Sequence, residues 1–210
     1  MTRGGSERAL LDGPAGAIEA VIDMPAAAPS GVALVAHPHP LFGGSLDNKV
    51  AQTLAKTFVE LDLIAIRLNF RGVGQSAGAH DEGRGEADDL VAVAEYARRR
   101  FGEAPPVLAG FSFGAWVQIQ VAQRLPPRRM VLVGVAAGSS SGGRAYAALP
   151  VPADTIVIHG EQDETVPLAN VFEWARPQDL PVVVIPGADH FFHRRLHIIK
   201  SVIKGQWLRH

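Results

Sequence analysis

The 210-residue sequence contains no cysteine, which excludes disulfide bonds, thiolate metal ligands and a cysteine nucleophile together. It also lacks an excess of either charge, because 20 basic side chains are balanced by 21 acidic ones. Neither nucleic acid nor a membrane surface is therefore expected as a partner. No stretch reaches the roughly 18 apolar residues needed to cross a bilayer. The N-terminal residues also lack the apolar run of a signal peptide, so a cytoplasmic location is expected.

Short aliphatic runs alternate with segments of helical period along most of the chain. Strands are predicted at residues 32–36, 63–68, 107–109, 130–135, 155–158 and 182–185. Helices are predicted at residues 46–61, 86–101, 113–125 and 194–208. This alternation is typical of an α/β fold with a mostly parallel sheet of about eight strands and helices on both faces. An apolar share of 47% fits a single domain over residues 1–210.

Two further segments complete the predicted organisation. The turn-rich sequence DGPAG, at residues 12–16, lies between two strand-like runs and predicts an antiparallel hairpin at one edge of the sheet. Residues 136–154 are rich in Gly, Ser and Ala and are predicted to form a mobile loop. The chain leaves no room for a separate cap domain.

The strongest chemical signal is the sequence GFSFG, which centres on Ser112. It matches the pattern G-x-S-x-G and lies between a predicted strand and a predicted helix. A sharp turn there requires small flanking residues and holds the serine hydroxyl at the carboxyl edge of the sheet. The helix N-terminus also favours the anion that forms when a serine attacks a carbonyl carbon. Ser112 is therefore predicted to be a nucleophile, whereas a Gly/Ser helix cap without chemistry is the structural alternative.

A serine nucleophile needs a histidine base and an acid that orients it. Asp163 and His190 each follow a predicted late strand, so their loops should leave the same sheet edge as Ser112. Among the other histidines, His37 and His39 are expected to stiffen their loop, and His159 to make a structural hydrogen bond. The interleaved prolines make a metal site at His37 and His39 improbable, and we expect neither a metal nor a cofactor.

With these residues the chain resembles the α/β-hydrolase superfamily from about residue 8 to 208. The segments HGEQDETVP and GADHFF are similar to the acid and histidine loops of that superfamily, and the order Ser, Asp, His is also its order. HPHPLFGG and the following DNK, within residues 37–49, resemble small bacterial hydrolases without a cap domain, relatives of dienelactone hydrolases and X-prolyl peptidase cores. Unlike true dienelactone hydrolases, the chain has serine in place of the nucleophilic cysteine. The resemblance implies an α/β-hydrolase fold.

Attack on a carbonyl also needs two N–H donors for the oxyanion. Phe113, which follows the nucleophile, is predicted to supply one. Pro38 and Pro40 have no N–H, which leaves Leu41 or His39 as the second donor, with Leu41 preferred. The aromatic residues nearest the motifs, Phe42, Phe111 and Phe191, are predicted to bind substrate.

The predicted activity is a serine hydrolase, a carboxylesterase that cleaves short-chain acyl esters of small molecules. A thioesterase, a lactonase or a prolyl-type peptidase would use the same residues. Residues 72–77, GVGQSA, fit a dinucleotide-binding pattern, but no helical period begins within it. Nucleotide binding and a non-catalytic scaffold are thus the alternatives of another class. The sequence is compatible with a homodimer and does not determine the oligomeric state.

Overall fold

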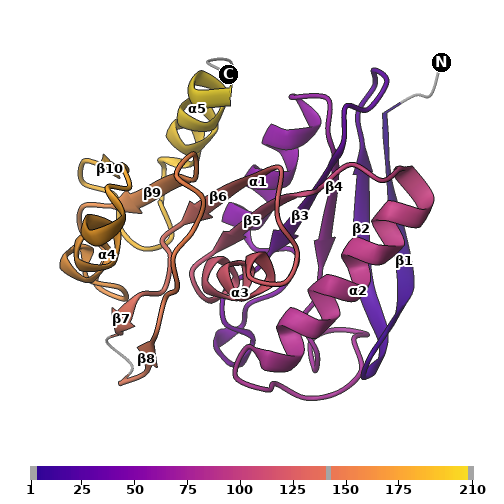
Figure 1. Ribbon diagram of the computed structural model, residues 1–210, viewed down its shortest axis with the longest axis horizontal. Coiled ribbons are helices and arrows are strands. Elements are labelled where there is room, and N and C mark those ends of the chain that lie inside the picture. Colours follow the sequence, from indigo (N-terminus) through magenta and orange to yellow (C-terminus); the bar gives the residue numbers. More distant parts are fainter. Residues whose placement is uncertain (1–3, 141–142, 208–210) are drawn as a thin grey trace.

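The computed structural model describes residues 4–140 and 143–207. In this part of the chain, eight strands form one sheet in the order β1-β2-β4-β3-β5-β6-β9-β10, shown in Figure 1. The strands are β1 (Gly5–Gly13), β2 (Gly16–Met24), β3 (Val32–Ala36), β4 (Ile64–Leu68), β5 (Val107–Phe111), β6 (Arg129–Val133), β9 (Ile156–Gly160) and β10 (Val182–Ile185). The β1–β2 hairpin is antiparallel, and β2 pairs antiparallel with β4, whereas all other neighbours are parallel. The predicted α/β fold class and edge hairpin are confirmed.

Helices cover both faces of the sheet because the central strands are apolar on both sides. The helices are α1 (Lys49–Val59), α2 (Arg84–Phe101), α3 (Phe113–Ala122), α4 (Leu168–Ala175) and α5 (Leu196–Trp207), with short 3₁₀ turns η1 (Pro40–Phe42) and η2 (Arg176–Gln178). Helices α1 and α5 pack into the core on one face. Helices α2, α3 and α4 pack into the core on the other face (Figure 1). No helix in the described ranges combines the length and the apolarity that a membrane span requires.

The structure contains two features in the second half of the chain that the sequence did not predict. Residues 136–154 contain a two-stranded antiparallel hairpin, β7 (Gly138–Ser139) and β8 (Ala145–Tyr146), where only a loop was predicted. Helix α4 was not predicted at all, since it has only eight residues. The predicted last helix agrees with α5, although its final residue, Leu208, lies outside the described ranges.

The parallel strands bring four connecting segments to one edge of the sheet. Ser112 follows β5, and the HPHPLFGG loop follows β3, the strand that pairs directly with β5. Asp163 follows β9 and His190 follows β10, and these two strands also pair with each other. Within residues 4–140 and 143–207 no inserted domain covers this edge, in agreement with the predicted absence of a cap.

Candidate active site

Ser112 lies on a tight turn between β5 and α3, in a backbone conformation that residues with a side chain rarely adopt. Its φ is 56° and its ψ is −119°. The glycines on either side allow this turn: a Cβ on Gly110 would lie 2.6 Å from the backbone nitrogen of Ala115. A Cβ on Gly114 would lie 2.6 Å from the carbonyl oxygen of Ala36, at the end of β3. The turn therefore presses the start of α3 against the end of β3 and raises the serine at the sheet edge.

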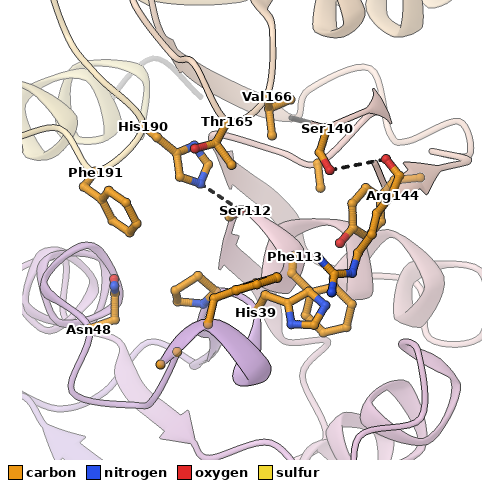
Figure 2. Close-up of a pocket in the computed structure, with 16 residues that line it drawn as sticks. His39, Asn48, Ser112, Phe113, Ser140, Arg144, Thr165, Val166, His190 and Phe191 are labelled. Carbon is orange, nitrogen blue, oxygen red and sulfur yellow. Dashed lines mark hydrogen bonds between the residues drawn. The ribbon is translucent and has the colours of Figure 1, made fainter. Parts of the chain in front are cut away.

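The structure brings the three side chains predicted for catalysis into one hydrogen-bonded chain. The Ser112 hydroxyl lies 3.0 Å from Nε2 of His190, and Figure 2 shows the imidazole pointing at the serine. Nδ1 of His190 lies 2.7 Å from Oδ2 of Asp163. Since a carboxylate only accepts, Nδ1 carries the proton and Nε2 is left as the acceptor for the serine O–H. All three residues are buried, with Ser112 8% exposed.

The Asp163 carboxylate is fixed by donors on both oxygens. Its Oδ1 accepts hydrogen bonds from the backbone N–H groups of Thr165, at 2.9 Å, and Val166, at 2.8 Å. Its Oδ2 faces His190 and lies 3.4 Å from Nε2 of His159, which also approaches the Val166 carbonyl oxygen at 2.9 Å. Two acceptors at Nε2 require His159 to carry its proton there. Burial above all lowers the pKa of His159, which keeps this ring neutral.

A cavity of about 320 Å³ opens beside Ser112 and His190 (Figure 2). Phe42 and Phe191, two of the predicted substrate-binding residues, line it and stay 67% and 47% exposed at its rim. Phe111 does not line the cavity and is completely buried. Its ring packs 4.9 Å from that of His190, centre to centre. The prediction that Phe111 contacts substrate is therefore corrected: alternation along β5 turns this side chain into the core, where it supports His190.

Two backbone N–H groups are available for an oxyanion. Those of Phe113 and His39 donate no hydrogen bond to any group in the described ranges, and both residues line the cavity. Leu41, the preferred second donor, is placed differently: its N–H faces Nδ1 of His39 at 3.2 Å. Leu41 is also 64% exposed and does not line the cavity. The structure thus favours His39, the alternative that the sequence left open.

The histidines of the HPHPLFGG loop stiffen it, as predicted. Nδ1 of His37 donates to the Pro38 carbonyl oxygen at 2.6 Å, and Nε2 accepts from the Phe70 N–H at 3.0 Å. Burial lowers the pKa of His37 to about 4. The pKa of His39 is also lowered to about 4, first by burial and then by electrostatic interaction with His80 and Arg144. Both rings are neutral at pH 7. Among residues 4–140 and 143–207, no three acidic or histidine side chains are grouped to ligate a metal.

The GVGQSA segment is occupied by an internal anion. Glu19 on β2 accepts hydrogen bonds from the Gln75 N–H at 2.9 Å and from the Asn69 side chain at 2.8 Å. A Cβ on Gly74 would collide with the same carboxylate. Glu19 therefore takes up the Gln75 N–H and the space beside Gly74, and α2 begins only at Arg84. In the described structure, this segment therefore lacks the helix N-terminus with free N–H groups that binds the pyrophosphate in dinucleotide-binding proteins.

Several cavity residues were not predicted from the sequence: Asn48, Ser140, Arg144, Tyr146 and Thr165. Three of them belong to the β7–β8 segment, whose Gly- and Ser-rich composition has no period that would place its side chains. Asn48 could have been found, because an Asn before a helical period is a common N-cap, and its Oδ1 accepts from the N–H groups of Val50 and Ala51. Thr165 is fixed by its backbone bond to Asp163.

The fold agrees with that of the relatives of the chain. No family model matches it. A serine hydrolase of the α/β type without a lid, XC6422 from Xanthomonas campestris, is 36% identical, with a TM-score of 0.89 over 100% of this chain and 95% of that one. The chain belongs to the α/β-hydrolase superfamily, in the group without a lid.

Two further relatives support this membership. An α/β serine hydrolase homologue from Coxiella burnetii is 37% identical to this hydrolase, with a TM-score of 0.84 over 95% of this chain and 96% of that one. The uncharacterized protein RP471 from Rickettsia prowazekii (strain Madrid E) is 32% identical over 202 residues, which cover 92% of this hydrolase and 85% of the relative. In the described part of this hydrolase no lid covers Phe42 and Phe191, so the cavity opens to solvent between them.

Proposed function

We propose that the protein is a carboxylesterase that cleaves short-chain acyl esters through an acyl-enzyme on Ser112. The observation that carries the proposal is the hydrogen-bonded chain from Ser112 through His190 to Asp163, with the serine hydroxyl facing a cavity of about 320 Å³. A scaffold without catalysis would not need Ser112 in a strained conformation opposite an unprotonated imidazole nitrogen.

In the first half of the reaction, Oγ of Ser112 attacks the ester carbonyl carbon while Nε2 of His190 takes the hydroxyl proton. The Asp163 carboxylate stabilises the imidazolium through its bond to Nδ1. When the tetrahedral intermediate collapses, the bond to the alcohol oxygen breaks and His190 returns the proton to that oxygen. The acyl group remains on Ser112 and the alcohol leaves.

The oxyanion of the intermediate needs donors at the point where its charge develops. The Phe113 N–H, at the first position of α3, and the His39 N–H, after β3, are two backbone donors on the cavity wall without a partner in the described residues. Loss of one such donor typically costs about 3 kcal/mol of barrier. Because His39 also binds the Leu41 N–H through its ring, the loop that carries this donor is held rigid.

In the second half, a water molecule attacks the acyl carbonyl and gives a proton to Nε2 of His190. The bond between the carbonyl carbon and Oγ of Ser112 then breaks, and His190 reprotonates the serine. The acid is released and the free enzyme is restored.

The cavity supports an ester substrate over a peptide. A peptidase that acts after an N-terminal X-Pro dipeptide needs an acidic group for the free ammonium. No Asp or Glu lines the cavity among the described residues. The rim residues Phe42 and Phe191 instead offer apolar surface to a short acyl or alkyl group.

The test is hydrolysis of p-nitrophenyl esters from acetate to decanoate by the purified protein, beside a short acyl-CoA and an X-Pro anilide. We expect the highest kcat/KM for a short acyl ester. Ser112→Ala is expected to lower kcat by roughly 10⁴-fold with an unchanged circular dichroism spectrum. If Ser112→Ala keeps most of the activity, the mechanism is wrong; if the acyl-CoA or the anilide is preferred, the esterase assignment is wrong.

A separate measurement addresses the nucleotide-binding alternative. Thermal unfolding is measured with and without NAD and NADP, which would stabilise a protein that binds them. We expect no shift in Tm, because the Glu19 carboxylate already occupies the Gln75 N–H of the GVGQSA segment and would repel a phosphate.

A further inference from the structure

Arg144, directly before β8, places a positive charge on the wall of the cavity beside Ser112. Its guanidinium carbon lies over the Phe42 ring, 4.4 Å from the ring centre, so the cation contacts the aromatic face. In the part of the chain that the structure describes, the guanidinium pairs with no carboxylate and donates no hydrogen bond. Arg71, by contrast, forms a two-pronged pair with Asp89. Arg144 is therefore held in place but its donors are unused.

Arg144 lines two adjoining hollows. One is the cavity that contains Ser112, and the other is lined by His80, Trp116 and Leu41. Figure 2 shows the Arg144 side chain running along the cavity wall toward His39. A ligand bound to Arg144 can thus still reach the serine.

The surroundings of Arg144 favour an anion. Of the described residues that line the cavity, none is Asp or Glu and Arg144 is the only Arg or Lys. The adjoining hollow adds one carboxylate, the exposed Glu82. The positive charge of Arg144 also reaches His39, since it contributes to the lowered pKa of that ring after burial and His80.

We propose that Arg144 binds a carboxylate of the substrate, so that the enzyme prefers esters that carry a second, ionised carboxyl group. The inference rests on the esterase function proposed above and names its substrate class. A guanidinium presents parallel N–H donors that match the two oxygens of a carboxylate. The contact with Phe42 holds this fork in place, which reduces the entropy lost on binding.

The carboxylate could belong to the acyl part or to the alcohol part of the ester, and two substrate pairs separate these cases. Monomethyl glutarate and methyl pentanoate differ only in a carboxylate or a methyl group at the end of the acyl chain. The pair 4-carboxyphenyl acetate and 4-methylphenyl acetate places the same difference on the alcohol side. The ratio of kcat/KM within each pair is measured at pH 7.5 for the native enzyme and for Arg144→Met, which keeps an apolar side chain against Phe42.

We expect the native enzyme to prefer the carboxylate in one pair, and Arg144→Met to lower that ratio roughly 10- to 100-fold. Arg144→Lys should give an intermediate ratio, because it keeps the charge but loses the planar fork. Arg176→Met is the matched control: it removes an exposed positive charge on η2 away from both hollows and should leave the ratio unchanged. Thermal unfolding checks that each variant is folded.

A second readout does not depend on turnover. Glutarate should inhibit hydrolysis of a neutral ester competitively, and its inhibition constant should rise roughly 10-fold or more in Arg144→Met. The proposal is overturned if the native enzyme shows no carboxylate preference in either pair, or if Arg144→Met leaves the preferred ratio unchanged. Failure of the esterase function itself looks different, because neither the neutral nor the charged esters would then be hydrolysed in a Ser112-dependent way.

Discussion

Nε2 of His159 lies 3.4 Å from the same carboxylate oxygen of Asp163 that accepts the hydrogen bond of His190 at 2.7 Å. His159 is fully buried, and its Nδ1 has no partner in the described residues. Its Nε2 bonds the Val166 carbonyl oxygen at 2.9 Å, and the Val166 N–H in turn donates to Asp163, so the ring is tied to the loop that holds the carboxylate. We infer that His159 is a positioning residue that shares Asp163 with His190.

Replacement of this ring should therefore alter catalysis. In His159→Leu the Asp163 carboxylate loses the polar Nε2–H group, whose nitrogen lies 3.4 Å away, so more of its negative charge acts on His190 and stabilises the imidazolium. We expect the acidic limb of the kcat/KM profile to move to higher pH by a few tenths of a unit. We also expect kcat to fall about 3- to 10-fold, because the loop that positions Asp163 loses the hydrogen bond that the ring donates to the Val166 carbonyl oxygen. His159→Gln places an amide N–H near the position of Nε2 and should restore the native profile in part. An unchanged pH profile in His159→Leu, with only a lower Tm, would mean that the ring has a packing role alone.

A second prediction concerns stability at acid pH and His37. The pKa of this ring in the folded protein is about 4, against an ordinary value of 6.5, because burial disfavours its charged form. Between these values the unfolded chain binds the proton more tightly than the folded protein does. The free energy of unfolding therefore decreases as the pH falls from about 6.5 to 4, by on the order of 3 kcal/mol from this group. Above pH 6.5 the contribution is constant.

Urea unfolding of the native protein and His37→Gln, at several pH values between 4 and 7.5, measures this contribution. The Gln side chain cannot titrate, but its carbonyl oxygen can accept the Phe70 N–H in place of Nε2. We expect the variant to be less stable at pH 7.5 and to lose less stability toward pH 4. Parallel pH dependences in the two proteins would show that His37 is not the titrating group.

The strained backbone of Ser112 leads to a third prediction. A φ of 56° with a ψ of −119° is accessible to glycine but costs residues with a Cβ about 1–3 kcal/mol. Ser112→Gly and Ser112→Ala both remove the nucleophile, and only the first also removes the strain. Ser112→Gly should therefore be more stable than Ser112→Ala by about 1 kcal/mol, or about 2–4 °C in Tm. Equal Tm values in calorimetry would argue that the turn carries no strain.

The fold and the positions of the three hydrogen-bonded side chains could be predicted from the sequence for one physical reason. Parallel strands are buried on both faces, so they appear as short aliphatic runs, and the residue after each run must lie at the carboxyl edge of the sheet. Ser112, Asp163 and His190 each follow such a run. Their meeting at hydrogen-bond distance then depends on strand order, which the resemblance supplied.

The residues of the cavity wall were harder to predict from the sequence, because the conformation of a loop depends on contacts between distant residues. Arg144 follows a run of Gly and Ser without period, and its position depends on the Phe42 ring, about a hundred residues earlier in the chain. Leu41 was preferred over His39 because the H-G-x pattern of the resembled family was matched to residues 39–41, but the Leu41 N–H instead donates to the His39 ring. Phe111 was predicted to bind substrate because it precedes Ser112, but strand alternation places its side chain in the core with those of Val107 and Ala109.

The close approach of α3 to β3 gives a last prediction. A Cβ on Gly114 would meet the carbonyl oxygens of Ala36 and His37, which belong to backbone and cannot move as a flexible side chain would. Gly114→Ala should therefore push α3 away from β3, lower the free energy of unfolding by about 2–4 kcal/mol and separate the Phe113 N–H from the His39 N–H. Gly205→Ala is the matched control, because Gly205 lies in α5 with no atom within 4 Å of an added Cβ. It should stabilise the protein slightly through better helix propensity. Urea unfolding and kcat for a short acyl ester measure both effects, and a Gly114→Ala variant with native stability and kcat would contradict the role given to this contact.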